Sequence, residues 1–310
     1  LHDHEIRLLK AHGQFPWVLG FAWQHTQSRR DSTLVSPLGA AGESERSVQV
    51  IGRDISEVSA FGEVSAALCT DLTLTAGLRL YRTALHDESG EEANANPRGA
   101  VHKGITPSAS LLWSPDGRTQ VYLRYARATR PGGLDVLGGP PLESDELDTL
   151  ELGTRLRFAD DRLHVRAGLY GFRWSHFQSD VLMLNGLFNT RDFGSARSYG
   201  GELTIGWTDD RWTLDAGVSL QHPRLDQESS TGETRLPAIS DITVHGLVVR
   251  RFRIGGTVAR LGLRVNYVSK SRLAFEEMLA RPSDGYVVAN LFGSLALDNW
   301  KLTMNIDNLT

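Results

Sequence analysis

Residues 120–135 have the sequence QVYLRYARATRPGGLD, and this stretch decides which kind of fold the chain can adopt. Alternate residues separate into two sets, Val121, Leu123 and Tyr125 on one side and Gln120, Tyr122 and Arg124 on the other. A period of two indicates a β-strand whose faces meet different surroundings. The strand follows a tight-turn signal at residues 114–117 (SPDG) and ends in RPGG at 130–133, where proline cannot donate to a ladder. We therefore predict a strand with a short turn at one end and a longer loop at the other.

The same unit recurs along the 310 residues. The cleanest alternation is at 71–80, where the leucines share one face and the polar residues share the other. We expect about fourteen strands, joined alternately by short turns and longer polar loops. The main loops are expected at about 27–55, 84–103, 129–146 and 223–237. Consecutive hairpins of this kind describe an antiparallel up-and-down meander.

The two faces of the predicted strands differ consistently, with leucine-rich positions on one face and charged positions on the other. Aromatic residues flank the short turns: Trp113, Phe158, Trp207, Trp212 and Trp300. Aromatic residues gathered at one level are typical of a membrane interface. The predicted fold class is all-β, an antiparallel up-and-down transmembrane β-barrel. A soluble sheet protein, in which these tryptophans fill a core, is the alternative.

The composition excludes some classes of protein. Hydrophobic residues make up 40% of the chain, and no run of about 18 apolar residues exists, which excludes a transmembrane helix. A membrane β-barrel needs only every second residue to be apolar. The net charge of −4 gives no footprint for nucleic acid. Cys69 is the one cysteine, so the chain has no internal disulfide and no multi-cysteine metal site.

Catalytic motifs are missing from the sequence, which has no nucleophile elbow, phosphate loop or zinc-type spacing. His2 and His4 share one strand face but are more typical of a solvated strand end than of a metal site. We therefore expect no enzyme activity, no cofactor and no metal ligands.

Four stretches together resemble the β-barrel part of TonB-dependent outer-membrane receptors. They are YLRYARATRPGGLD at Tyr122–Asp135, LELGTR at Leu150–Arg155, ARSYGGEL at Ala196–Leu203 and IDNL at Ile306–Leu309. Each motif alone is weak, and it is their order and spacing over residues 1–310 that carry the resemblance. This resemblance implies a barrel of 22 strands that surrounds an N-terminal plug domain.

The resemblance also implies that residues 1–310 are a partial barrel domain. Both ends look cut, and neither a plug nor a TonB-binding segment is seen. If Ile306–Leu309 marks strand 21, the first strand here is strand 8, and the last strand is missing. An open sheet would leave backbone N–H and C=O groups in lipid without hydrogen-bond partners. Each such group costs several kcal/mol. We therefore expect missing chain to complete the sheet, unless it closes on itself at fourteen strands.

The function implied by the resemblance is active transport across the outer membrane of a Gram-negative bacterium. The expected ligand is a ferric siderophore, and the expected partners are the TonB complex, reached through the missing N-terminal region, and outer-membrane lipid, with no nucleic acid. The alternatives are a passive channel of about fourteen strands, a truncated non-functional receptor remnant, and a soluble carbohydrate-binding β-protein.

Charged residues on the polar face are candidates for lining the lumen of such a barrel. These are Arg79, Arg124, Glu151, Arg155, Arg157, Glu202 and Arg264. The arginines are expected to pair with Glu151, Glu202 and Asp215 or to pack on the plug. A second interpretation is that they form an anion-attracting path for an acidic chelate.

Overall fold

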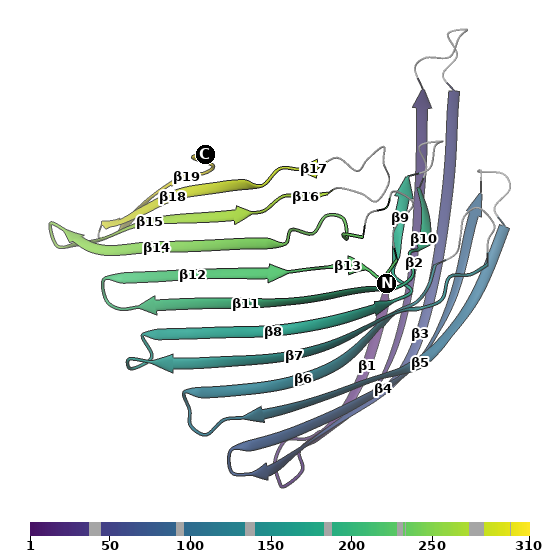
Figure 1. The fold of residues 1–310 in the computed structure, drawn as a ribbon, viewed down its shortest axis with the longest axis horizontal. Coiled ribbons are helices and arrows are strands. Elements are labelled where there is room, and N and C mark those ends of the chain that lie inside the picture. The colour runs from purple at the N-terminus through teal and green to yellow at the C-terminus, as the bar shows by residue number, and fades with distance from the viewer. Residues whose placement is uncertain are drawn as a thin grey trace.

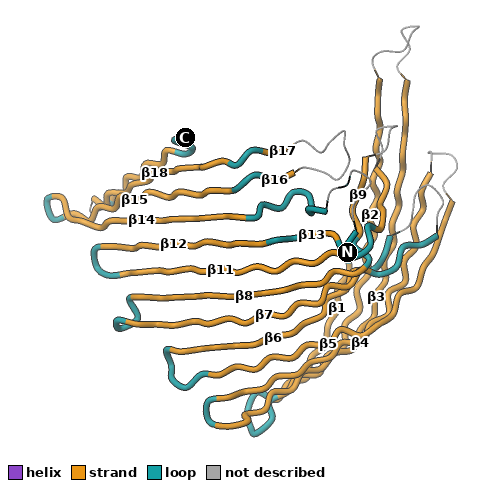
Figure 2. Tube along the Cα trace, viewed as in Figure 1, coloured by secondary structure: helices purple, strands orange, loops and turns teal. Residues whose placement is uncertain are grey.

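The computed structural model describes residues 1–36, 45–90, 96–133, 140–182, 188–227, 232, 234–272, 282–297 and 299–310. Within these ranges the chain forms strands and turns and no helix (Figures 1 and 2). The main strands, in chain order, are β1 (His2–Lys10), β2 (Trp17–Ser36), β3 (Glu45–Cys69), β4 (Leu72–Gly90), β5 (Asn96–Trp113), β6 (Thr119–Arg130), β7 (Asp145–Phe158), β8 (Leu163–Ser175), β11 (Ala196–Thr208), β12 (Trp212–Gln221), β14 (Ile242–Ile254), β15 (Thr257–Val268), β18 (Tyr286–Leu297) and β19 (Trp300–Ile306).

Five smaller strands lie in the longer connections, namely β9 (Gln178–Leu182), β10 (Phe188–Asp192), β13 (Arg224–Leu225), β16 (Ser271–Arg272) and β17 (Pro282–Ser283). The strands β9 and β10 pair with each other, as do β16 and β17. Strand β13 pairs with the start of β11 and so belongs to the main sheet.

The fourteen main strands pair in chain order in one curved antiparallel sheet, which confirms the predicted meander (Figure 1). Short turns gather at one end of the sheet and longer connections at the other (Figure 2). Among the described residues, β1 pairs only with β2 and β19 only with β18. The sheet therefore does not close on itself at fourteen strands.

Short turns are stabilised by aspartate side chains that accept backbone hydrogen bonds. The carboxylate of Asp116 accepts the N–H groups of Arg118 and Thr119 at 2.8 and 2.5 Å. Asp209 repeats this geometry with the N–H groups of Arg211 and Trp212, both at 2.7 Å. Aspartate favours such turns because its side chain satisfies the backbone locally.

Pairing register separates the sheet into two faces, because directly paired residues lie on the same side. We call one the apolar face; a typical row across it is Leu111, Leu123, Leu152, Leu169 and Gly201. The five predicted aromatic residues at the turn end lie on this face. The other, the charged face, includes fully buried strand residues such as Thr83 and Asp87, at 0% and 3% exposure. Side chains are crowded on the concave side of a curved sheet, so the charged face is the concave one in this region.

Aromatic rings cover glycines on the charged face, each ring lying across a glycine of the neighbouring strand. The cross-strand pairs are Phe61–Gly20, Tyr81–Gly104, Tyr122–Gly153, Tyr170–Gly200, His245–Gly217 and Phe292–Gly262. A Cβ atom at Gly153 would lie 2.3 Å from the Tyr122 ring, so only glycine leaves room for it. A ring over a strand glycine protects the bare backbone and fixes the register.

Two of the predicted loops were wrong. Strands β2 and β3 pair as far as Ser36 and Glu45, and β4 and β5 as far as Ser89 and Asn96. Little of the expected loops at 27–55 and 84–103 therefore remains, and the tips at 37–44 and 91–95 lie outside the described residues. The alternation fades in these extensions because each face mixes polar and apolar residues, while the backbone pairing continues. The loop expected at 129–146 is confirmed at its ends, since β6 stops at Arg130 and β7 starts at Asp145.

Candidate functional site

The seven charged candidates lie on one face of the sheet, the charged face. Arg124 on β6 is directly opposite Glu151 on β7. The pairing of the other strands shows which of their residues lie on the same face. The full set is Arg79, Arg124, Glu151, Arg155, Arg157, Glu202 and Arg264. Residues that line one lumen together must lie on one face, and these seven residues do.

The ion-pair partners differ from the expected ones. Arg79 binds Glu57, whose other carboxylate oxygen accepts the hydroxyl of Thr83 at 2.7 Å. Asp215, an expected arginine partner, lies 3.1 Å from Nε2 of His245 instead. These partners sit on the neighbouring strand but not at the position that sequence spacing indicated.

Glu151 is held by a tyrosine. Its Oε1 accepts the hydroxyl of Tyr122 at 2.5 Å, and the guanidinium of Arg155 lies 5.9 Å from the centre of the same ring. The ring of Tyr122 thus carries one acidic and one basic neighbour. An arginine above an aromatic ring is attracted by the ring face and remains a hydrogen-bond donor to other groups.

Arg157 lies apart from the others, at the turn end of β7. Its guanidinium donates to the backbone carbonyl of Gly117 and lies 3.8 Å from Asp161. These contacts tie two adjacent turns together, which is a structural role. In contrast, Arg124, Glu202 and Arg264 form no ion pair within 4 Å in the described ranges of the chain.

The RPGG segment at 130–133 lies at the loop end of β6 and connects three parts of the chain. Arg130 binds Asp145 through Nε at 2.8 Å and reaches the backbone carbonyl of Gln178 at 3.2 Å. The Gln178 side chain accepts the N–H of Gly133 at 3.2 Å and donates to the carbonyl of Glu143 at 2.7 Å. We call Arg130, Gly133, Glu143, Asp145 and Gln178 the RPGG junction.

Glycine is required at 132 because the returning chain passes very close. A Cβ atom there would lie 2.0 Å from the carbonyl oxygen of Leu142 and 2.4 Å from that of Glu143. The N–H of Leu142 also donates to the carbonyl of Gly133 at 2.9 Å. Backbone atoms cannot swing aside as a side chain can, so this contact sets the position of the loop.

A partly buried ion pair lies beside the RPGG junction, near the loop ends of β3 and β4. Arg53 binds Asp87 with both Nε and a terminal nitrogen, the shortest contact being 2.6 Å. That terminal nitrogen would lie 3.0 Å from a Cβ at Gly133. Arg53, Asp87, Asp145 and Gln178 are the polar residues that sequence reasoning missed, because each depends on a partner at least 15 residues away.

Burial shifts two titrating groups in the extensions beyond the central sheet. Burial raises the pKa of the Asp145 carboxyl, although its ion pair with Arg130 opposes the shift. Burial lowers the pKa of His102, and nearby Glu143 partly offsets this. The loop end is therefore less hydrated than its polar sequence suggests.

An apolar cluster joins two of the longer connections above β8 and β11. Phe177, Ala196, Leu225 and Leu236 form it, with Trp174, Phe193 and Ile239 packed against them. The Trp174 and Phe177 rings meet edge to face with centroids 4.7 Å apart. This packing brings Phe177 and Phe193 of one connection together with Leu225 and Leu236 of the other.

Within the described residues, no group of three or more His, Cys, Asp or Glu side chains is arranged to hold a metal ion. The described part of the chain also contains no helix that is long and apolar enough to span a membrane.

A family model described as "TonB dependent receptor-like, beta-barrel" matches residues 3–309. The chain belongs to this family.

Several relatives of this TonB-dependent receptor barrel carry names that describe transport. The ferric-pyoverdine 358 receptor of Pseudomonas putida is 24% identical over 223 residues, which cover 69% of this chain and 26% of the relative. The ferric yersiniabactin uptake receptor FyuA from Yersinia pestis matches 99% of this chain and 48% of its own, with a TM-score of 0.81 and 16% identity. The copper transporter OprC matches 99% of this chain and 50% of its own, with a TM-score of 0.74 and 19% identity.

At these identities the solved structures show the fold alone. The chain spans about half the length of the solved structures it matches and about a quarter of the curated relative. The relatives are transport receptors rather than enzymes.

Proposed function

We propose that this chain is part of an outer-membrane receptor for TonB-coupled uptake, in which the charged face lines the lumen and the apolar face meets lipid. The observation that carries the proposal is the separation of the two faces in the central parts of the main strands. Leucines on the apolar face are widely exposed, Leu169 at 65%, although the sheet is continuous behind them. An apolar surface of this size is unfavourable in water and is typical of a surface that contacts lipid.

The two free edges support a larger barrel in the complete receptor. Within the described ranges, each edge strand presents a row of backbone N–H and C=O groups without strand partners. Each such group costs several kcal/mol in hydrocarbon. Strands from outside residues 1–310 would pair with β1 and β19 and remove this cost. The family's barrels are large enough to hold a plug in the lumen.

The ligand we propose is a ferric siderophore, and the supporting observation is the presence of unpaired arginines on the charged face. Arg124 and Arg264 have no carboxylate within 4 Å in the described ranges, so they would attract an anionic chelate. Two of the relatives are named for ferric siderophores, and one is named for copper. Copper is therefore the second candidate ligand.

The ligand class is tested by deleting the gene and measuring uptake of radiolabelled iron from a panel of ferric siderophores, with copper uptake measured in parallel. We expect uptake of at least one ferric siderophore to fall to the background level. Unchanged uptake across the whole panel would remove the iron proposal, and a fall in copper uptake alone would replace it with copper.

The lumen assignment is tested separately with the full-length receptor carrying Arg124→Gln and Arg264→Gln. If these arginines attract an anionic ligand, its association rate should fall by about tenfold at low salt and by less at high salt. The matched control is Arg118→Gln in the exposed turn after β5, which should leave the rate unchanged. Equal rates for the variant and the control would contradict an attracting role.

A further inference from the structure

We propose that the apolar face carries a binding site for a lipid with a phosphorylated headgroup, formed by a groove across β6 to β12 and a row of arginines above it. The proposal rests on the membrane orientation proposed above but concerns neither the ligand nor the lumen. Its elements are a groove of suitable depth, an aromatic rim and a cluster of like charges, all on the same strands.

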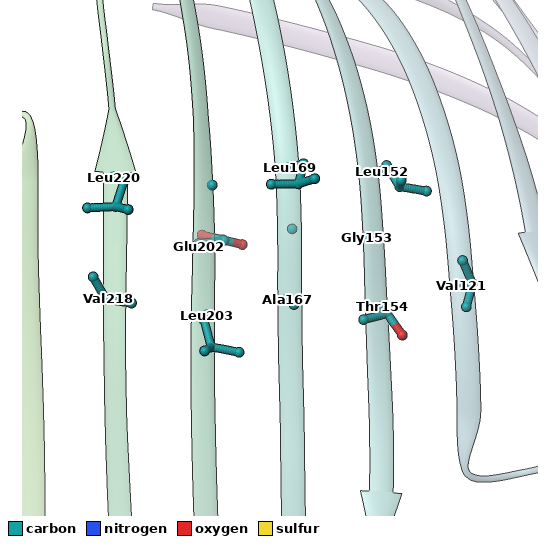
Figure 3. Close-up of a pocket in the computed structure, with 12 residues that line it drawn as sticks. Val121, Leu152, Gly153, Thr154, Ala167, Leu169, Glu202, Leu203, Val218 and Leu220 are labelled. Carbon is teal, nitrogen blue, oxygen red and sulfur yellow. The ribbon is translucent and has the colours of Figure 1, made fainter.

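The groove has a volume of about 530 Å³ and is lined almost entirely by apolar side chains (Figure 3). Its floor is low because three consecutive strands carry small residues there, Thr154, Ala167 and Gly201. Its walls are the larger residues around them, Val121, Leu152, Leu169, Leu203, Val218 and Leu220. A flexible acyl chain fills such a furrow better than a flat aromatic ligand does, because the furrow is long, shallow and apolar.

The rim of the groove is aromatic. One row above Leu169 and Gly201, the register brings Tyr125, Leu150, Gly171 and Tyr199 side by side. Tyr199 is 65% exposed although its ring is large. On β11, eight residues separate Tyr199 from Trp207 at the turn end, roughly 27 Å of strand. Two aromatic levels about this far apart are typical of the two interfaces of an outer-membrane barrel.

The next row up is cationic. It contains Arg127, Arg173, Arg197 and Arg224, which the register places in order along the row with Asp148 between the first two. We call these four residues the arginine row. Because Arg173 and Arg224 each lie directly opposite Arg197, three like charges are adjacent, an arrangement that is destabilising unless an anion lies among them.

The carboxylates near the arginine row do not balance it evenly. Arg127 takes two of them, binding Asp148 through both nitrogens at 2.8 Å and Glu146 at 3.2 Å. At the other end, among the described residues, Asp226 lies 3.2 Å from Arg197. Asp148 also lies directly opposite Arg173, so the described part of the row has four arginines and three carboxylates (Glu146, Asp148 and Asp226). A net positive charge of about one remains, which favours binding of an anionic phosphate group.

The level of this excess charge indicates its ligand. Arginines on the lumen side would meet a transported solute, but the arginine row lies on the outer side, just above the aromatic rim. Arginine binds phosphate through two parallel hydrogen bonds, which favours it over lysine at such a site. A phosphate headgroup on the row places its acyl chains directly over the groove.

The test uses the full-length receptor in detergent, with native mass spectrometry to count bound lipid. The probes are diphosphoryl lipid A and the same lipid with its phosphates removed. We expect the phosphorylated form to be retained, and the double variant Arg173→Gln with Arg197→Gln to weaken retention by at least about tenfold. Arg166→Gln, on the same strand but on the opposite face, is the matched control and should retain lipid normally.

A second variant tests the groove. Ala167→Leu fills the floor and should reduce retention of both lipid forms, whereas Val248→Leu on the apolar face of β14 should not. Equal retention of the two lipid forms by the unaltered receptor, or normal retention by the double variant, would overturn the proposal. Displacement of the lipid by millimolar inorganic phosphate would also overturn it, because the site would then select phosphate without the acyl chains. Uptake does not enter these measurements, so failure of the transport proposal is distinguishable from failure of the lipid site.

Discussion

The two ends of the same strands are held by different kinds of interaction. At the turn end of β6, Asp116 accepts hydrogen bonds from residues two and three positions ahead. At the loop end, Arg130 binds residues 15 and 48 positions away. The turn end is therefore stable hairpin by hairpin, whereas the loop end is stable only when several distant segments are in place together.

The largest effect is expected for Gly132→Ala at the loop end. The new Cβ would meet the carbonyl oxygens of Leu142 and Glu143, and a backbone clash of this kind costs about 3 kcal/mol. We expect rapid proteolysis of the 131–145 segment in the full-length receptor. Gly117→Ala is the control at the turn end, where a Cβ meets nothing within 4 Å. Equal cleavage rates for the two variants would mean that the ends do not differ.

Asp145→Ala is expected to have the next largest effect. It removes a buried carboxylate, at 3% exposure, and leaves Arg130 without its ion pair. Because the Arg130 side chain is more than half exposed, water offsets much of the loss, and we expect about 2 kcal/mol less stability for the RPGG junction. Hydrogen exchange of residues 130–133 measures this.

The control for this prediction is Asp160→Ala, at a turn where Asp160 lies 3.8 Å from Arg118 in full exposure to solvent. Its exchange should match that of the unaltered receptor. Slow exchange at 130–133 in Asp145→Ala would show that Gln178 alone holds the junction.

Gly153→Ala tests the middle of the strands, between the two ends. The new Cβ would press on the Tyr122 ring, which can rotate away, so we expect a smaller cost of about 1–2 kcal/mol. The temperature at which the folded band disappears on semi-native gels should fall. Gly246→Ala, where a Cβ meets nothing within 4 Å, is the control. A normal transition temperature for Gly153→Ala would mean that the ring pairing does not stabilise the strands.

The smallest effect is expected at Asp209, in a short turn. The indole N–H of Trp207 and two backbone N–H groups lower the pKa of this carboxyl below its ordinary value. Its stabilising effect is therefore complete at neutral pH and is lost only as the pH falls through the lowered pKa. Asp209→Asn should speed hydrogen exchange at Arg211 and Trp212 at pH 7 and match the unaltered receptor at strongly acidic pH. A difference that persists in acid would assign the effect to the amide side chain.

Strand number and the two faces could be predicted from sequence because both depend on local alternation. The stretch at 120–130 is an example, since its apolar and polar sets lie on the expected faces. The strands beyond Thr26 and Thr83 were missed because the alternation fades where each face mixes polar and apolar residues. Backbone pairing there continues without a pattern in the side chains.

The candidate site was predicted only as a face. The sequence indicated that Arg124 and Glu151 are on one side, but Glu151 binds Tyr122 rather than an arginine. The RPGG motif could be recognised in the sequence. Gln178, which binds the backbone of this motif, is an ordinary polar residue at the edge of a predicted loop. Contacts of this kind depend on how the loops return over the sheet, and no local spacing encodes them.

The strict chain order of the sheet also has a consequence for assembly. Every seam between the fourteen main strands joins neighbours in the sequence, so each hairpin can form with a short closure. A seam that closes a barrel joins strands separated by hundreds of residues. For a flexible chain, the entropy of that closure is larger by roughly 4 kcal/mol than for a three-residue turn. We therefore expect this meander to form from its hairpins outward, with the closing seam made last.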